Sequence, residues 1–504
     1  MDAKQVAEVM SHFADLCAHP PRPQRDSMPG PLPQSELEAH GLTFVAVNLV
    51  FRHGARNAIH DPSGCFESKV AEGLFSDCHL RQGMAIAPRD ASGGKADSLP
   101  PLLKTYHDEY HEQLNAPGVG TGCGPSQLLD EAQLQFHALA LAARDAYFDR
   151  LPQEPTRATT WSYSTDTDRT LGSTYLFRHY LFGEGGDQFD AGRVQTRNFA
   201  SDAWACRVPC PAASAAIADA KRYAYSSGDG AEKEAERRAS AAFSKRWEEA
   251  FGKPFHAVCH DPVLVSKCTG RLPNASLVGL NQSVIEGLLD EAVAVDYWQA
   301  RTKYLKYKEA WTLLVGPALL ELQDFARRQA SGIEKRAFAT WATHDTTIIP
   351  MLVALGAWDY AWPQYSEALA LEVYRGASAS LAEGKAYVRF LRRGRVVKVP
   401  SCDPGGPLGL CDLETFLPKA VAKLRDRNVW ASSCSMTPST PTVSGSTIVM
   451  TSQSVEPMAI LGMGMLIGAL LALGVMFGAG VNMGRASMSM SMLRKSLLEE
   501  RSSP

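Results

Sequence analysis

Residues 43–56 read TFVAVNLVFRHGAR, and this stretch decides the fold. Its first eight residues are apolar and β-branched without strict alternation, which is typical of a parallel strand that is covered on both faces. The charged residues that follow it, Arg52, His53 and Arg56, are therefore expected at the carboxyl end of a buried strand, where open α/β sheets hold their ligands. Gly54 permits a tight turn and the close approach of a ligand.

The residue types in this segment favour phosphate chemistry. Arginine forks match phosphate oxygens bidentately. An imidazole between two arginines can attack phosphorus while the guanidinium groups hold the oxygens. A histidine beside an arginine is more often part of a solvated surface cluster, and a short motif is only a hypothesis. The segment therefore needs partners elsewhere in the chain.

A first partner is the sequence STDTDRTL at residues 164–171. It follows a short strand-like run at 159–163 and precedes an expected helix from Leu171 to Phe182. Arg169 lies in the first helical turn, where the helix dipole disfavours a positive charge. A residue placed against a local preference is a candidate for function. The alternative is an ordinary capped helix that carries a surface arginine.

A second partner is the sequence AFATWATHDTT at residues 337–347. It predicts another buried strand, followed by an apolar helix over residues 348–355 that Gly356 closes. His344 can donate a hydrogen bond to a phosphate oxygen. Asp345 can act as general acid, because a carboxyl group beside phosphate in a low dielectric can hold a proton at mildly acidic pH. The alternative is that Asp345 merely caps the helix.

These three motifs, in this order, resemble those of the histidine acid phosphatases, a branch of the histidine phosphatase superfamily. The resemblance extends from about Thr43 to Leu417. It implies an α/β fold with a central, mostly parallel sheet flanked by helices, like the core of the phosphoglycerate mutases, with a smaller helical insert domain and, in this chain, one C-terminal transmembrane helix.

The same resemblance implies a role for each motif residue. His53 would be the nucleophile that becomes phosphohistidine, and Asp345 would protonate the leaving alcohol. The phosphate pocket would consist of Arg52, Arg56, Arg169 and His344, with no metal and no organic cofactor. The chain departs from the family pattern at positions that affect the shape of the substrate pocket rather than the phosphate contacts, namely Ala58, Leu129, Ala132 and Tyr163.

The composition is that of an ordinary globular protein. The 504 residues are 45% hydrophobic and 21% charged, which suffices for one large domain with an insertion or for two domains. The net charge is −3, and no run of basic residues is interleaved with aromatic ones. These features argue against a nucleic-acid partner.

Composition and motif positions predict how the chain is organised. We expect a flexible N-terminal segment at 1–40, a first part of the α/β core at 41–182 with a cap or loop region at 57–125, a mainly helical insert at 183–330, a second part of the core at 331–430, a Ser/Thr/Pro-rich stalk at 431–457, a transmembrane helix at 458–483 and a cytosolic tail at 484–504.

The cysteines indicate an oxidising compartment. Six of the eleven form close pairs in loop-like sequence, Cys206 with Cys210, Cys259 with Cys268 and Cys402 with Cys411. Zinc is the competing interpretation, but the spacings do not form a clean pair of Cys-x-x-Cys knuckles. Cys402–Cys411 is the best local disulfide, and the family pattern implies that Cys206 or Cys210 reaches Cys434.

The apolar run from Met458 to Val481 carries no charge and, at about 1.5 Å per residue, can cross a hydrocarbon core of about 30 Å. Basic residues follow it, which predicts a cytosolic tail and a lumenal or extracellular catalytic domain, whether endosomal or lysosomal, in the Golgi or at the cell surface. No signal-like apolar run precedes Thr43, so either the start of the chain is incomplete, which we favour, or the protein is tail-anchored.

Two weaker patterns complete the sequence analysis. Asn274 and Asn281 stand in glycosylation acceptor patterns, which predict a glycoprotein unless they arise by chance. Glycines four residues apart in the predicted span, Gly464 with Gly468 and Gly474 with Gly478, would allow two such helices to pair, which makes a homodimer an alternative to a monomer.

The sequence therefore predicts a membrane-anchored acid phosphatase that hydrolyses phosphate monoesters through a phosphohistidine. The cysteine-rich middle is similar to the 2-phosphoxylose phosphatase branch, which acts on a phosphorylated sugar in the Golgi, whereas membrane-bound acid phosphatases of broad specificity fit the tail equally well. Phosphoryl transfer to a second substrate, as in a mutase, is the alternative within the enzyme class. The non-enzyme alternative is a membrane receptor on an inactive phosphatase fold.

Overall fold

A computed structural model describes residues 28–60, 62–71, 83–86, 102–105, 126–182, 194–225, 231–376, 385–403 and 405–435. All of these residues lie within one compact unit, which ends at residue 437. The predicted stalk, transmembrane helix and cytosolic tail lie almost entirely outside the described residues. Among the described residues, no helix is long and apolar enough to cross a membrane.

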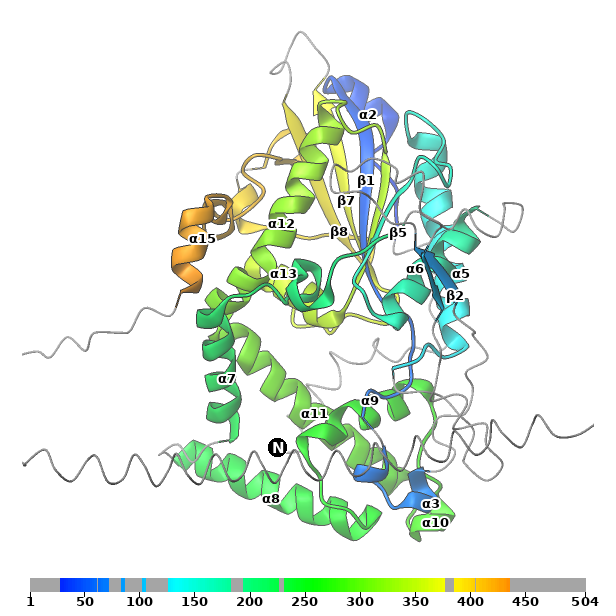
Figure 1. The fold of residues 1–504 in the computed structure, drawn as a ribbon, viewed down its shortest axis with the longest axis vertical. Coiled ribbons are helices and arrows are strands. Elements are labelled where there is room, and N and C mark those ends of the chain that lie inside the picture. Colours follow the sequence, from blue (N-terminus) through cyan, green and yellow to red (C-terminus); the bar gives the residue numbers. More distant parts are fainter. Residues whose placement is uncertain are drawn as a thin grey trace, which may run out of the picture. The chain divides into compact units, whose positions relative to one another are not determined.

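A mixed sheet forms the centre of the fold (Figure 1). Its strand order is β10-β8-β7-β1-β6-β4-β5, and β9 pairs with β8. The strands are β1 (Leu42–Arg52), β4 (Trp161–Ser164), β5 (Val194–Gln195), β6 (Phe338–Thr343), β7 (Ala368–Gly376), β8 (Ala386–Arg392), β9 (Arg395–Val396) and β10 (Cys411–Asp412).

The expectation of a mostly parallel sheet is correct for only one half of it. The pairings of β1 with β6, β6 with β4 and β4 with β5 are parallel. The pairings of β1 with β7, β7 with β8, β8 with β9 and β8 with β10 are antiparallel. Strands β7 and β8 are joined by residues 377–385, a connection too short for the crossover helix that a parallel pair requires.

Helices cover both faces of the sheet, as the apolar sequence of β1 predicts. On one face, Leu49 and Phe51 belong to an apolar cluster that includes residues of α5 (Glu131–Tyr147) and α6 (Asp168–Phe182). On the other face, Val50 belongs to a cluster that includes residues of α12 (Lys308–Ala330) and α13 (Asp345–Ala354). Among the described residues, helices therefore cover both faces of the sheet, as is usual for parallel strands.

The segment 183–330 is mainly helical where it is described. It contains α7 (Pro211–Tyr225), α8 (Ala231–Phe251), α9 (His260–Thr269), α10 (Ala275–Val278) and α11 (Gln282–Lys306) before α12. Aromatic rings anchor α8 to the loop that follows β1, because Phe66 packs on Trp247 and Phe251. The other described α-helices are α2 (Gln34–Ala39), α3 (Ser68–Ala71), α14 (Lys419–Ala422) and α15 (Arg427–Cys434). Strands β2 (Gly83–Ile86) and β3 (Leu102–Thr105) form a separate antiparallel pair.

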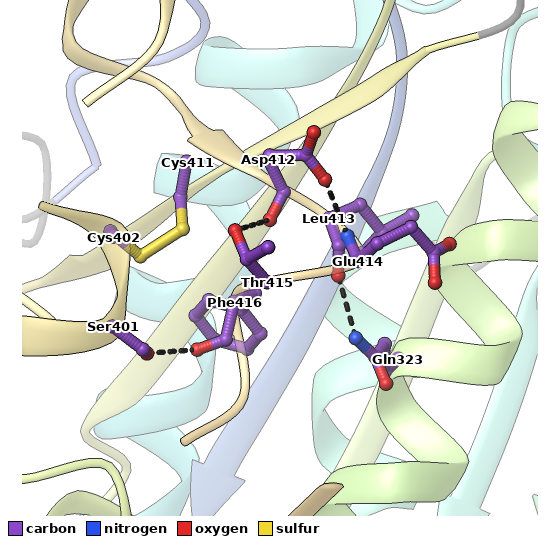
Figure 2. Close-up of a disulfide and its surroundings, with 9 residues drawn as sticks. All are labelled: Gln323, Ser401, Cys402, Cys411, Asp412, Leu413, Glu414, Thr415 and Phe416. Carbon is purple, nitrogen blue, oxygen red and sulfur yellow. Dashed lines mark hydrogen bonds between the residues drawn. A yellow bond between two sulfur atoms is a disulfide. The ribbon is translucent and has the colours of Figure 1, made fainter. Parts of the chain in front are cut away.

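Two of the expected disulfides are present. Cys402–Cys411 closes a loop next to residues 412–416, and the Gln323 amide donates to the Leu413 carbonyl beside it at 2.6 Å (Figure 2). Cys210 reaches Cys434, as the family pattern implied. The close pairs Cys206–Cys210 and Cys259–Cys268 are not disulfides, because Cys259 pairs with Cys65 and Cys206 is a free thiol. Sequence proximity misleads here because α9 lies against the loop after β1.

The two confirmed disulfides are expected to differ in their effect on stability. In the chain-entropy description, Cys210–Cys434, which joins residues 224 positions apart, stabilises the fold by about 5 kcal/mol. Cys402–Cys411 spans 9 positions, so its contribution is about 2.5 kcal/mol. Denaturant unfolding of the Cys210→Ser/Cys434→Ser and Cys402→Ser/Cys411→Ser proteins checks this order. Equal losses would contradict it.

Candidate active site

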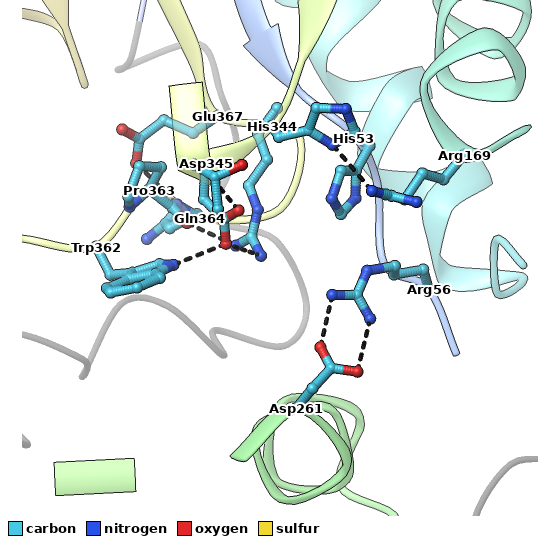
Figure 3. A network of polar contacts seen from close by, with 12 residues as sticks. His53, Arg56, Arg169, Asp261, His344, Asp345, Trp362, Pro363, Gln364 and Glu367 are labelled. Carbon is cyan, nitrogen blue, oxygen red and sulfur yellow. Dashed lines mark hydrogen bonds and ion pairs between the residues drawn. The ribbon is translucent and has the colours of Figure 1, made fainter. Parts of the chain in front are cut away.

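The parallel half of the sheet brings the three motifs together. In the register of the sheet, Arg52 of β1 lies beside Thr343 of β6, and Ala342 lies beside Ser164 of β4. The backbone continues this pairing past the strand ends, because His53 N donates to the Thr343 carbonyl at 3.0 Å. His53, Arg169 and His344 therefore meet at the carboxyl edge, where the sequence places them (Figure 3).

His53 is oriented so that one ring nitrogen is left as a nucleophile. Its side chain is buried, and its Nδ1 lies 2.9 Å from the Gly54 carbonyl oxygen. A carbonyl only accepts, so Nδ1 carries the proton and Nε2 keeps its lone pair. Burial, followed by the charges of Arg169, Arg52 and Arg56, lowers the pKa of His53 well below 6.5. The imidazole is therefore neutral at mildly acidic pH.

Gly54 is required by packing of the protein itself. A Cβ at this position would lie 2.6 Å from the Cβ of Ala132, in the first turn of α5. The absence of a side chain lets α5 and α6 approach the turn and bind its amides. The Gly54 amide donates to Ser173 Oγ at 3.0 Å, and the Ala55 amide donates to Gln135 Oε1 at 2.8 Å. The sequence predicts a tight turn and ligand approach at this glycine, and the structure adds its close packing against α5.

Three buried or nearly buried guanidinium groups surround the imidazole, and each is held by other side chains or carbonyls. Arg52 donates to the Pro363 carbonyl and pairs with Asp345, both at 2.7 Å, and lies 4.3 Å above the Tyr365 ring centre. Arg56 pairs with Asp261. Arg169 donates to Ser126 Oγ at 2.6 Å and to His344 Nδ1 at 3.2 Å.

In each of these three arginines, the Nε donor has no partner among the described residues. The Nε atoms of Arg52, Arg56 and Arg169 are buried and have no hydrogen-bond acceptor among the described residues. Other buried donors among the described residues, such as the indole N–H groups of Trp161 and Trp341, also lack an acceptor, so these three are distinguished by lying around one imidazole. An anion with several oxygens, such as phosphate, satisfies donors of this kind.

His344 is neutral and fully hydrogen-bonded. Because a guanidinium only donates, the 3.2 Å contact with Arg169 makes Nδ1 of His344 the acceptor. Nε2 therefore carries the proton and donates to Thr165 Oγ1 at 3.0 Å. Burial and the charge of Arg169 lower the pKa of His344 well below 6.5. His344 can donate to a phosphate, as the sequence predicts, only after one of these bonds is exchanged.

Asp345 is held as a carboxylate. Its Oδ2 accepts from Arg52 Nη2 at 2.7 Å and from the Trp362 indole N–H at 3.0 Å, and its Oδ1 accepts from the Thr346 amide. Burial by itself would raise the pKa of Asp345, but the Arg52 charge and the Trp362 hydrogen bond outweigh it, and the pKa lies below its usual value. The proton that the sequence predicts for Asp345 belongs to the complex with phosphate, whose negative charge would raise this pKa.

The loop before β7 positions these groups, and the sequence motifs did not reveal that role. It supplies Trp362 to Asp345 and the Pro363 carbonyl to Arg52, and the Ser366 amide donates to the His53 carbonyl at 3.1 Å. Buried Glu367 holds the loop by accepting from Arg392 Nε at 2.6 Å and Arg393 Nε at 2.7 Å. The sequence YSE at residues 365–367, which resembles the histidine acid phosphatases, was the only part of the loop that could have indicated this role.

Asp261 is a further site residue that the sequence did not indicate. It lies at the start of α9, far from every motif in the sequence. In space, its carboxylate forms a bidentate pair with Arg56. Among the described residues, no group of three or more His, Cys, Asp or Glu side chains is arranged to hold a metal ion. The described donors are instead suited to an oxyanion.

No family model matches the sequence. Curated proteins similar to it include lysophosphatidic acid phosphatase type 6 from Homo sapiens, 33% identical over 114 residues, which are 22% of this chain and 25% of the relative. The protein of the same name from Bos taurus is 29% identical over 133 residues, or 26% and 28% of the two chains. The chain thus matches about a quarter of the length of these relatives. They confirm the resemblance to the histidine acid phosphatases, the family of these relatives.

Solved structures with similar folds are phytases and inositol polyphosphate phosphatases. Hafnia alvei phytase in complex with tartrate has a TM-score of 0.45 and 13% identity, covering 76% of this chain and 98% of its own. The apo form of the multiple inositol polyphosphate phosphatase of Bifidobacterium longum has a TM-score of 0.40 and 13% identity, covering 77% and 95%.

The two buried histidines make stability dependent on pH. Because the pKa values of His53 and His344 are lowered in the folded state, the unfolded chain binds more protons below pH 6.5. The free energy of unfolding should therefore fall as the pH decreases from 6.5 to 5.5, by up to about 1 kcal/mol for each histidine. Urea unfolding at several pH values measures this slope.

A matched pair of variants isolates the histidine contribution. His53→Gln should reduce the pH slope, whereas His137→Gln, at an exposed position on α5, should leave it unchanged. An unfolding free energy that stays constant or increases over this range would show that the buried imidazoles are not neutral.

Proposed function

We propose that this protein is an acid phosphatase that hydrolyses phosphate monoesters through a phosphohistidine at His53. The observation that carries the proposal is the set of three unpartnered Nε donors, on Arg52, Arg56 and Arg169, around an imidazole whose Nε2 is free of hydrogen. Similarity to proteins named lysophosphatidic acid phosphatase type 6 supports the same reaction class.

In the first step, Nε2 of His53 attacks the phosphorus atom in line with the ester bond. The N–P bond forms while the bond from phosphorus to the alcohol oxygen breaks, and Asp345 gives its proton to that oxygen. The guanidinium groups stabilise the charge on the three equatorial oxygens. Because Nδ1 keeps its hydrogen bond to the Gly54 carbonyl, the ring stays aligned throughout the step.

Asp345 must gain its proton in the substrate complex. Arg52 by itself keeps the pKa of Asp345 low, but a bound phosphate adds negative charge beside the carboxylate and shares the Arg52 charge. Both effects raise the pKa of Asp345. Uptake of this proton favours acid pH, which agrees with a nucleophile that stays neutral there.

The second step releases phosphate. Asp345, now ionised, accepts a proton from a water molecule, and the resulting hydroxide attacks phosphorus from the side that the alcohol has left. The P–N bond breaks, and its electron pair returns to Nε2 of His53. Inorganic phosphate leaves, His53 is again neutral, and Asp345 carries the proton taken from water, as it did before the first step.

We also propose, from the sequence, that residues 458–483 anchor the protein in a membrane with its catalytic unit on the lumenal or extracellular side. The disulfides Cys65–Cys259, Cys210–Cys434 and Cys402–Cys411 support that placement, because disulfides persist mainly in oxidising compartments. Comparing kcat/KM of the active protein for lysophospholipid and phosphosugar monoesters would show which of these two classes contains the natural substrate.

Turnover of p-nitrophenyl phosphate as a function of pH tests the reaction. Activity should persist well below pH 6.5, because the pKa of His53 is lowered, and should decline towards alkaline pH as Asp345 loses its proton. His53→Ala should reduce kcat/KM by at least about a thousandfold, whereas His137→Ala should not. A folded protein that binds phosphate without turnover at any pH would favour the receptor alternative.

The role of Asp345 is tested by the dependence on the leaving group. Asp345→Asn should lower kcat/KM by about a hundredfold or more for an alkyl phosphate, whose alkoxide needs a proton, and by much less for p-nitrophenyl phosphate. Trapping of phosphohistidine with ³²P-labelled p-nitrophenyl phosphate should remain detectable in this variant. Equal losses for both substrates would mean that Asp345 only positions Arg52.

A further inference from the structure

Asp261 occupies one edge of a guanidinium that the proposed function assigns to phosphate. Its Oδ1 lies 2.7 Å from Arg56 Nη2, and its Oδ2 lies 3.3 Å from Arg56 Nη1 (Figure 3). The same Oδ2 accepts from the Ile59 amide at 2.6 Å. Arg56 outweighs burial and keeps the pKa of Asp261 below its usual value, so the residue is a carboxylate.

Among the described residues, one edge of the Arg56 guanidinium keeps N–H groups that can bind a phosphate. Nη1 spends one hydrogen on the Asn57 carbonyl at 2.9 Å and the other on Asp261. Nη2 spends its inner hydrogen on Asp261. The N–H of Nε and the outer hydrogen of Nη2, which point in the same direction, are left. Asp261 therefore binds the edge of the guanidinium formed by Nη1 and Nη2. The edge formed by Nε and Nη2 remains as a second pair of donors for bidentate binding.

The position of Asp261 is enforced by covalent and ionic contacts. The disulfide Cys65–Cys259 joins the loop after β1 to the residue that precedes α9. At the other end of α9, Arg271 pairs with Glu131 of α5 at 3.0 Å. The helix is thus fixed to the core on both sides of the site, so the carboxylate cannot simply withdraw into solvent when a substrate binds.

The carboxylate also changes the charge of the site. Among the described residues around His53, three guanidinium groups face the carboxylates of Asp345 and Asp261, which leaves one net positive charge. A single phosphate group can be balanced here, whereas a second anionic group near Asp261 meets negative charge.

We infer that Asp261 is a specificity-determining residue, which holds Arg56 side-on to the phosphate and disfavours substrates with a second anionic group next to the scissile phosphate. The preferred class is a phosphate monoester whose alcohol part is neutral or cationic near the ester oxygen. This inference rests on the proposed function, since it concerns which monoesters the same site accepts.

The test compares two substrates that differ only in charge. Glycerol 3-phosphate and 3-phosphoglycerate have the same carbon skeleton, but the second carries a carboxylate in place of a hydroxymethyl group. The wild-type protein should favour glycerol 3-phosphate by at least about tenfold in kcat/KM, because the carboxylate is repelled by Asp261. Equal kcat/KM values for the two substrates would overturn the inference without any variant being needed.

Variants then assign the preference to Asp261. Asp261→Asn retains the shape and an acceptor for Arg56 but removes the charge, so the preference should fall by about tenfold. Asp261→Glu keeps the charge and should keep the preference even where kcat decreases. Asp324→Asn, at a surface ion pair with Arg425, is the matched control and should change nothing.

The outcomes separate this inference from the proposed function. If the wild-type protein hydrolyses neither glycerol 3-phosphate nor p-nitrophenyl phosphate, the proposed function fails and this inference fails with it. If it hydrolyses them, and Asp261→Asn keeps the wild-type preference in a protein with an unchanged melting temperature, only the specificity role of Asp261 is refuted. Should Asp261→Asn fail to fold, a loss of preference in Cys65→Ser/Cys259→Ser, which releases α9, supports the inference and an unchanged preference opposes it.

Discussion

The parallel pairing of β1 with β6 and of β6 with β4 is the constraint on which the site depends. Parallel strands end at the same edge of a sheet, so residues 53, 165 and 344 lie close together there although they are far apart in the sequence. Thr165 and His344 are hydrogen-bonded to each other. Among the described residues, helices lie on both faces of the sheet. The turn at Gly54 can lie directly on α5 only because it lacks a side chain.

Electrostatics then determine the state of each group at that edge. Burial and three guanidinium groups keep His53 neutral, while Arg52 keeps Asp345 ionised. For the proposed phosphatase reaction the two effects have opposite consequences. The neutral His53 can act as nucleophile at acid pH, whereas the ionised Asp345 cannot act as general acid. A bound phosphate resolves the conflict by adding negative charge next to Asp345. In this description, the substrate completes the catalytic machinery.

The helical segment takes part in the same balance rather than serving only as a cover. Its helix α9 carries Asp261 to Arg56, and a disulfide to the loop after β1 holds it there. On the other side of the imidazole, Glu367 and two arginines of the β8–β9 turn hold the loop that contacts Arg52 and Asp345. Arg52 and Arg56 are thereby positioned by residues outside their own motif.

The sequence alone determined the strand that precedes His53, the three motifs and the local disulfide Cys402–Cys411, because each of these is a property of adjacent residues. It paired Cys259 with Cys268 and predicted a mostly parallel sheet, and the structure corrects both. Only the tertiary structure decided the Cys65–Cys259 bond, the antiparallel half of the sheet, the ionised Asp345 and the Asp261–Arg56 pair. These depend on which distant segments pack together, and charge and burial at a site are sums over such neighbours.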